Sequence, residues 1–264
     1  MFIIGERING MFKDVARAIK EKDKSVIHDL ALKQVSCGAN ALDVNVGPAS
    51  ASPKEAMEWL VKTIEDVTDI SLAIDTTKQD VMELGLSLCK SKPIINSVNA
   101  NEEKMKALFG LAKKYKASII GLTMDKSGIP KDSEGRMELA MKIVASCVEY
   151  GIDIAGLYLD AVILPVNVAQ PHAKEVLKTI RDSKLLAEPS PKTVLGLSNI
   201  SQGSPAEYKS LINRTFLTMA IANGLDAAIL DVTDKELMDS LITAELLMEK
   251  QLYCNSYLEA YRKK

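Results

Sequence analysis

The sequence is poor in the residues that build zinc sites and disulfides, and it lacks the long apolar runs of membrane spans. It contains two histidines and four cysteines, and none of the cysteines lies in CxxC spacing. This excludes the common zinc motifs and is typical of buried or half-buried thiols in a reducing compartment. No stretch approaches the ~18 consecutive apolar residues that a membrane span needs. The cysteines are Cys37, Cys89, Cys147 and Cys254.

An excess of either charge is also missing. The chain has 33 Lys and Arg against 35 Asp and Glu, a net charge of −2, which argues against nucleic-acid binding through a basic surface. The apolar start is broken by Gly5, Glu6 and Arg7, so it lacks the core of a signal peptide. We expect a cytoplasmic protein that binds neither nucleic acid nor membrane.

Common catalytic motifs are absent as well. There is no G-x-G-x-x-G fingerprint, no P-loop and no G-x-S-x-G elbow. No lysine follows an apolar run where a Schiff-base nucleophile would be expected. The chemistry must therefore rest on other residue types.

What the sequence does contain is a repeat of short apolar runs rich in Ile, Val and Leu, each followed by a segment of helical period. Runs of this kind are typical of parallel strands that are buried on both faces. Eight strand–helix repeats predict a (β/α)8 TIM barrel, an α/β fold that occupies residues 1–264 as a single domain. An open doubly wound sheet is the alternative. The runs cover residues 2–4, 41–46, 72–74, 93–95, 118–122, 157–159, 194–197 and 227–230.

Capping residues mark several helix ends. Ser and Asp before a periodic segment favour a helix start, Pro suits the first turn, and Gly suits the residue after the end. We predict helices from a Ser25 cap to Cys37, from a Ser52 cap with Pro53 in the first turn, from an Asp132 cap to Tyr150, and from Asp234 to near the C-terminus.

In such barrels the active site lies at the carboxyl ends of the strands. The first polar groups there are mostly carboxylates and amides. A pterin ring presents an N–H beside an NH2 group, which a carboxylate can accept in a bidentate pair. Mg²⁺ or Ca²⁺ would also suit these oxygens. The residues are Glu6, Arg7, Asn9, Asp43, Asn45, Asp75, Asn96, Thr123, Asp160, Ser198, Asn199, Gln202 and Asp231.

Long strings along the whole chain resemble the methyltetrahydrofolate:corrinoid/iron–sulfur protein methyltransferases. They occur in the family's order. The strings are IIGERING (3–10), DVNVGP (43–48), AID (73–75), INS (95–97), GLTMDKSGIPKD (121–132), LYLD (157–160), ILPVNVAQ (163–170), KTVLGLSNISQG (192–203) and LINRTFLTMA (211–220).

The resemblance implies a pterin-binding barrel similar to dihydropteroate synthase and to the folate module of cobalamin-dependent methionine synthase. It implies a homodimer that moves the N5-methyl group of 5-methyltetrahydrofolate to the Co(I) of a separate corrinoid iron–sulfur protein, as in the reductive acetyl-CoA pathway. Cobalamin would be carried by that partner, and no metal would be bound. Asp75, Asn96 and Asp160 would hold the pterin, and Asn199 would activate N5 as the catalytic residue.

Further residues would line this site. Gly196, Ser198 and Gln202 follow from the resemblance, while Asp43 and Glu6 are expected to bind substrate from their strand-end positions. Three alternatives remain: the same folate chemistry with a corrinoid protein of O-demethylation or methylamine use, a non-catalytic folate-binding subunit, and a dihydropteroate synthase. The last needs basic groups for a pyrophosphate near the seventh and eighth strands, where the sequence has none at the strand ends.

Overall fold

The computed structural model describes residues 1–48, 50–250 and 253. Eight parallel strands close into a barrel in sequence order, and β8 pairs with β1. This confirms the predicted (β/α)8 barrel over the open sheet; the assignment of residues 1–264 to one domain stays a prediction. The strands are β1 (Phe2–Asn9), β2 (Ala41–Asn45), β3 (Ser71–Asp75), β4 (Ile94–Asn99), β5 (Ser118–Leu122), β6 (Leu157–Asp160), β7 (Lys192–Gly196) and β8 (Ala227–Leu230).

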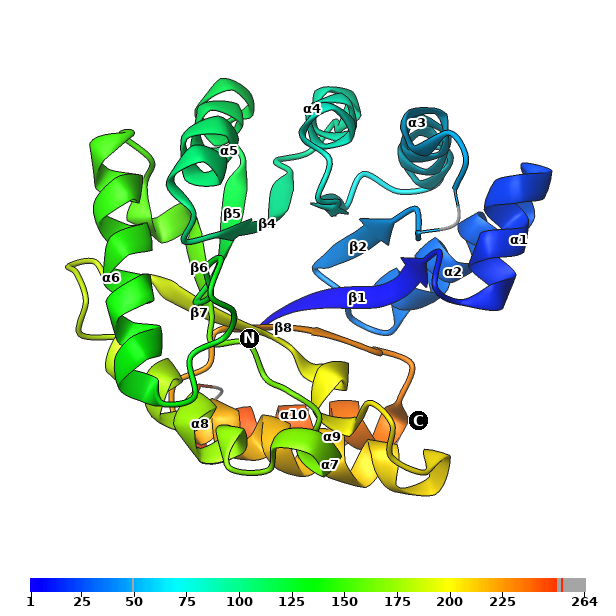
Figure 1. Ribbon diagram of the computed structural model, residues 1–264. Coiled ribbons are helices and arrows are strands. Elements are labelled where there is room, and N and C mark those ends of the chain that lie inside the picture. Colours follow the sequence, from blue (N-terminus) through cyan, green and yellow to red (C-terminus); the bar gives the residue numbers. More distant parts are fainter. Residues whose placement is uncertain (49, 251–252, 254–264) are drawn as a thin grey trace.

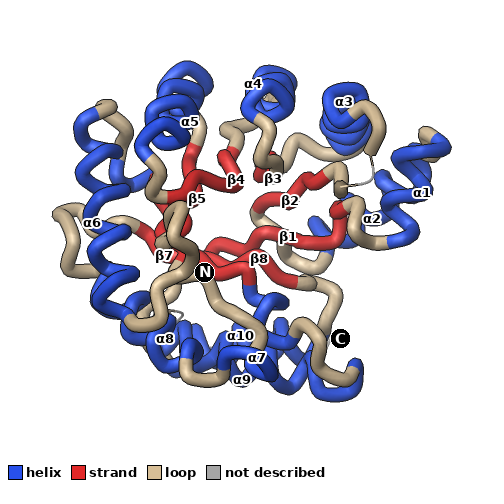
Figure 2. Tube along the Cα trace, viewed as in Figure 1, coloured by secondary structure: helices blue, strands red, loops and turns tan. Residues whose placement is uncertain are grey.

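Helices surround the strands in an outer ring (Figures 1 and 2). They are α1 (Lys13–Glu21), α2 (Lys24–Ser36), α3 (Pro53–Glu65), α4 (Gln79–Leu88), α5 (Glu102–Tyr115), α6 (Ser133–Glu149), α7 (Val166–Ala169), α8 (His172–Ser183), α9 (Ala206–Ala222) and α10 (Lys235–Leu247), with 3-10 turns η1 (Ile154–Gly156) and η2 (Leu197–Ser201). None of the helices among the described residues is long and apolar enough to cross a membrane.

Two apolar cores hold these layers together. The larger core fills the space between strands and helices, with fully buried residues such as Leu60 and Phe109. The smaller one fills the inside of the barrel, where each strand contributes one inward side chain. The barrel interior is therefore packed and is not a pore. The inner residues are Ile4, Ala41, Ala73, Ile94, Ile120, Tyr158, Val194 and Ala227.

Most predicted helix caps are confirmed, and one is wrong. Asp132 and Asp234 precede α6 and α10, and each carboxylate accepts a backbone N–H of the first turn. Ser52 precedes α3 but makes no capping bond through its side chain. The cap of α2 is Asp23 and not Ser25, because the carboxylate of Asp23 accepts both the N–H and the hydroxyl of Ser25.

Strand and helix bounds also differ from the expectation in places. The fourth strand begins at Ile94 and continues to Asn99, beyond the apolar run that predicted it. The last helix ends at Leu247 and a turn follows at residues 248–250, so the expected run toward the C-terminus is wrong at that point; residues 251–252 and 254–264 lie outside the described ranges. The thiols agree with the expectation, since Cys37 and Cys89 are half-buried and Cys147 is buried, all of them free; Cys254 lies outside the described residues.

Two strands depart from regular pairing near their carboxyl ends. The register of β1 against β2 shifts between Gly5 and Ile8, and that of β4 against β5 shifts between Asn96 and Val98. Such irregularities re-aim side chains and are common beside active sites. Here they lie at Glu6 and Asn96, two of the predicted site residues.

Candidate active site

A cavity of about 560 Å³ opens at the carboxyl ends of the strands. All nine residues that were expected to bind substrate or act in catalysis line it, although they come from distant parts of the sequence. The structure thus brings the predicted residues together in one place; their roles remain predictions. They are Glu6, Asp43, Asp75, Asn96, Asp160, Gly196, Ser198, Asn199 and Gln202.

Two carboxylate–amide pairs lie along one wall of the cavity, which Asp43, Asp75 and Asn96 line. The amide of Asn96 donates to Oδ1 of Asp43 over 2.8 Å, and the amide of Asn45 donates to Oδ2 of Asp75 over 2.6 Å. Burial, together with the charge of Asp75, raises the pKa of Asp43 well above its ordinary value. Burial also raises the pKa of Asp75, against the hydrogen bond from Asn45. The wall therefore holds protons more tightly than free carboxylates would.

Asp160 is fixed by its own backbone surroundings. Its Oδ1 accepts the N–H of Val162 over 2.7 Å, and the N–H of Gly196 also bonds its carboxylate. Burial nevertheless raises the pKa of Asp160 to about 6. Val162 has φ +56°, which is unusual for a β-branched residue and costs ~1–3 kcal/mol. Neighbouring contacts must hold this turn in place.

The side chain of Arg136 supplies one of those contacts. It is fully buried and reaches from α6 to the carbonyl of Ala161, which its Nε bonds over 2.9 Å. Its other nitrogens contact the carbonyl of Asp132 at 3.2 Å and Nδ1 of His172 at 2.9 Å. Arg136 thus ties the loop after Asp160 to the first turns of two helices. The sequence analysis missed this residue.

Glu6 and Ser198 face each other across the cavity floor. The Ser198 hydroxyl donates to Oε1 of Glu6 over 2.7 Å. Burial raises the pKa of Glu6 to about 7, against the Ser198 hydrogen bond and with help from the charge of Asp231. At neutral pH Glu6 is therefore divided between its acid and its carboxylate.

The side chain of Asn199 occupies the space above Gly196. A Cβ added at Gly196 would lie 3.0 Å from Nδ2 of Asn199, closer than ordinary packing allows. Asn199 lies in η2 and is exposed, so its amide reaches into the open part of the cavity. Glycine at position 196 therefore leaves room for the amide that the resemblance places at N5.

Not every predicted strand-end residue lines the cavity. Thr123 donates to the carbonyl of Asp160, and Asp231 accepts from Thr233; neither is among the described residues that line the cavity. The lining instead includes Met11, Phe12 and Lys209, which sequence reasoning did not select. Lys209 lies in the first turn of α9. Its place in the segment after β7 is the feature of the sequence that could have identified it as a cavity residue.

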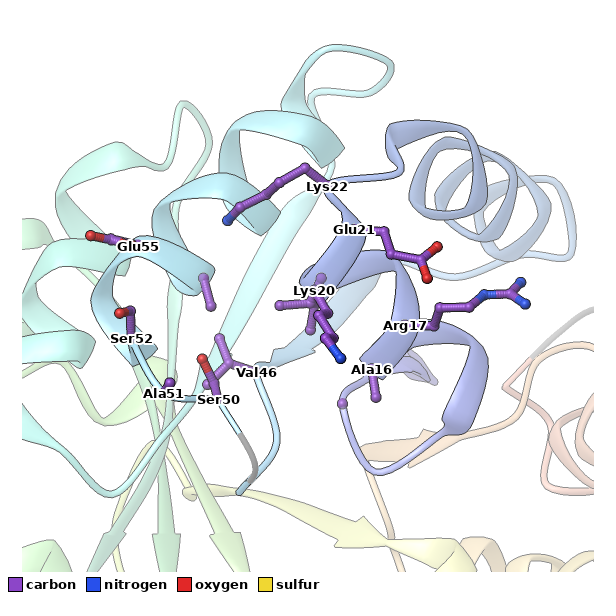
Figure 3. A pocket seen from close by; sticks show the side chains of 13 residues that line it. Ala16, Arg17, Lys20, Glu21, Lys22, Val46, Ser50, Ala51, Ser52 and Glu55 are labelled. Atoms are coloured by element: carbon purple, nitrogen blue, oxygen red, sulfur yellow. The ribbon is translucent and has the colours of Figure 1, made fainter.

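A larger hollow of about 660 Å³ lies between α1 and α3 (Figure 3). Its charged side chains belong to the outer surfaces of the two helices. Figure 3 shows Lys20 pointing toward the gap beside Ser50, whereas Arg17 points away. Its lining includes Gly10 and Val46, which directly follow β1 and β2, but none of the polar residues predicted for the site. Its size alone does not make it the functional site, since it gathers no buried polar groups.

A metal was the rival explanation for the carboxylates. Within the described ranges, no group of three or more His, Cys, Asp or Glu side chains is placed to hold a metal ion. The Asp43 and Asp75 carboxylates each accept an amide N–H group on one oxygen. The arrangement suits a ligand that donates hydrogen bonds.

Comparisons with known proteins agree with this geometry. Residues 7–231 match the model of the pterin binding enzyme family. A methylcorrinoid:tetrahydrofolate methyltransferase of Eubacterium limosum is 29% identical over 99% of this chain and 96% of its own length. A methionine synthase of Mycobacterium leprae is 28% identical over 87% of this chain, which spans only 20% of that relative.

Solved structures show the same fold. The dihydropteroate synthase of Yersinia pestis, in a structure with a pterine–sulfa conjugate, superposes with a TM-score of 0.69 over 95% of this chain and 94% of its own, at 16% identity. At that identity the likeness concerns the fold alone. The family match covers most of the chain and includes the residues that line the cavity apart from Glu6. The protein belongs to the pterin binding enzyme family.

Proposed function

We propose that this protein transfers a methyl group between N5 of a reduced folate and the cobalt of a corrinoid carried by a separate protein. The observation that carries the proposal is the ring of carboxylates and amides at the barrel mouth. Its support is the likeness over the full chain to a methylcorrinoid:tetrahydrofolate methyltransferase.

The pterin ring fits the polar wall of the cavity. Asp75 uses Oδ2 for Asn45, which leaves Oδ1 for the N–H and NH2 edge of the pterin. Asp160 is held by the backbone N–H groups of Val162 and Gly196 and lines the same cavity, so its carboxyl group is positioned to accept from the ring as well. Asn96 adds an amide carbonyl beside them, because its Nδ2 is taken by Asp43. These groups anchor the ring and fix its angle for an in-line transfer.

Asn199 is assigned to the reacting nitrogen. An amide can donate or accept a hydrogen bond, so it can follow the change of charge at N5 during transfer. Interactions that strengthen only as the amine leaves lower the barrier. The amide cannot provide a proton itself, so a further acid is needed.

The partner and the setting are finer parts of the proposal. We assign the corrinoid iron–sulfur protein of the reductive acetyl-CoA pathway as the partner, with a homodimeric enzyme in the cytoplasm and cobalamin bound only by the partner. The alternative is the same folate chemistry with a corrinoid protein of O-demethylation or methylamine use. Size-exclusion chromatography with light scattering tests the dimer.

Anaerobic stopped-flow absorbance tests the transfer directly. The protein and 5-methyltetrahydrofolate are mixed with cob(I)alamin. Loss of the Co(I) band with growth of methylcobalamin supports the proposal. Binding of 5-methyltetrahydrofolate without transfer, also when a corrinoid protein is supplied, would reduce the protein to a folate-binding subunit.

A further inference from the structure

The hydrogen bond between Glu6 and Ser198 joins two residues that are far apart in the sequence and adjacent at the cavity floor. Ser198 immediately precedes Asn199, and all three residues line the same cavity. We propose that Glu6 is the acid that protonates the leaving N5 through the hydroxyl of Ser198. This inference rests on the proposed function, because it names the proton source for that transfer.

Glu6 differs from the other carboxylates of the cavity in its partner. Asp43 and Asp75 accept amide N–H groups, and Asp160 accepts backbone N–H groups. An amide donor can hold a carboxylate but cannot pass a proton onward. The partner of Glu6 is a hydroxyl, which can accept one proton while it donates another. Among the described carboxylates of the site, Glu6 is therefore the one whose hydrogen-bond partner can pass a proton on.

The charges around Glu6 keep it protonated part of the time. Asp231 at the end of β8 disfavours its carboxylate form. The charge of Glu6 in turn helps to raise the pKa of Asp43 on β2. Arg7 opposes Asp231 only in part, because its guanidinium pairs with Asp14 at 2.9 Å and stacks over the ring of Phe12 at 3.9 Å. Lys209 on α9 contributes a cation at the rim of the same cavity. With burial as the largest cause, the pKa of Glu6 rises to about 7.

The step balances without another reactant. The bond from N5 to the methyl carbon breaks, and its electron pair stays on N5. The methyl carbon bonds to the Co(I) of the corrinoid substrate. N5 takes the proton of the Ser198 hydroxyl, and that hydroxyl takes the proton of Glu6, which becomes a carboxylate. Glu6 is partly exposed and regains its proton from water. In the reverse direction the Glu6 carboxylate accepts the proton that N5 releases.

The two directions give opposite pH profiles. Forward transfer needs the acid form of Glu6, so its single-turnover rate falls as the pH rises through about 7. Reverse transfer, from methylcobalamin to tetrahydrofolate, needs the carboxylate, so its rate rises over the same range. A residue with a structural role alone would not produce this inversion.

The experiment measures both profiles by anaerobic stopped-flow between pH 5.5 and 8.5, with free cobalamin as the probe. Glu6→Gln keeps the shape of the side chain and removes its proton, so both profiles should lose the step near 7 and the forward rate should fall roughly 10²-fold at low pH. Ser198→Ala breaks the relay and should have the same effect on both profiles. Glu55→Gln, an exposed carboxylate of α3, is the matched control and should behave as the wild type.

Folate affinity is measured for every variant to confirm that the site has folded. If the wild type transfers the methyl group and Glu6→Gln keeps the change of rate near pH 7, the relay is overturned and the proposed function stands. If only Ser198→Ala keeps the change of rate near pH 7, the path of the proton through the hydroxyl is overturned. No transfer by the wild type at any pH would contradict the proposed function and the relay together.

Discussion

The inside of the barrel contains two layers that differ by two residues along each strand. Ile4, Ala73 and Ile94 belong to the apolar inner core. Glu6, Asp75 and Asn96, two positions later on the same strands, line the cavity. The same step leads from Ala41 to Asp43, from Tyr158 to Asp160 and from Val194 to Gly196. Because side chains alternate with a period of two, both layers point inward.

The comparison separates the residues that stabilise the fold from those that form the site. The lower layer is the apolar inner core, and it buries apolar surface, which favours folding. The upper layer consists of the residues two positions later that line the cavity. The upper layer buries carboxyl groups, whose raised pKa values show that their charged forms lose hydration. One strand can carry both layers because they are separate in space. Changes in the lower layer should therefore affect stability, and changes in the upper layer should affect ligand and rate.

The largest expected effect is on stability, from Ile4→Ala in the lower layer. Ile4 is 1% exposed, so the substitution leaves a cavity and should lower the free energy of unfolding by ~2–5 kcal/mol. Urea denaturation measures this change. The affinity for 5-methyltetrahydrofolate, measured below the unfolding range, should stay within about threefold. A large loss of affinity with little loss of stability would contradict the separation of the layers.

Asn199→Ala should have the largest effect on rate. Removal of a donor that acts as charge develops typically costs ~10²–10³-fold in turnover, and a similar loss is expected here. Single-turnover transfer to cob(I)alamin measures it. Since Asn199 is exposed, the unfolding free energy should change little. An unchanged rate would remove Asn199 from the reaction.

Asp75→Ala and Asp160→Ala should weaken folate binding. Each loses a charge-assisted hydrogen bond to the pterin, worth ~1.5–3 kcal/mol, so Kd should rise roughly 10- to 100-fold. Calorimetry or fluorescence quenching provides the measurement. Asp125→Ala, in the loop after β5 and away from the cavity lining, is the control. If both site variants bound folate as the wild type does, the assignment of the pterin anchor would be wrong.

The smallest effect concerns the pH dependence of stability. The pKa of Glu6 is raised in the folded protein from 4.5 to about 7, so its contribution to stability is present below pH 4.5 and is lost as the pH rises through 7. Glu6→Gln should therefore be more stable than the wild type at pH 8, by on the order of 1 kcal/mol. The difference should shrink toward pH 5. Thermal unfolding at both pH values tests this, and a less stable variant at pH 8 would contradict the burial of Glu6.

The strand ends could be predicted because two simple regularities meet there. An apolar run that stops at a polar residue marks both the strand and its carboxyl end, where barrels place their sites. Asp75, Asn96 and Asp160 were found in this way. The polar residues of the upper layer can thus be predicted from the local sequence pattern of each strand.

Other parts depend on contacts between distant residues. Arg136 lies on a helix and looks like a surface residue in the sequence, yet it is fully buried against the loop of Ala161. Lys209 has the pattern of a solvated lysine, and only the closure of the barrel brings it to the cavity. The cap of α2 was misplaced because Asp23 and Ser25 are both good caps, and only their mutual hydrogen bonds decide between them.

The central claim is that the polar layer binds a reduced pterin and not a metal ion. Isothermal titration calorimetry of 5-methyltetrahydrofolate into the protein, in buffer with EDTA, tests it most directly. We predict binding of one folate per chain that is unaffected by EDTA and is weakened by Asp160→Ala. Absence of folate binding, with heat released instead on titration of Mg²⁺ or Ca²⁺ after removal of the chelator, would contradict the claim.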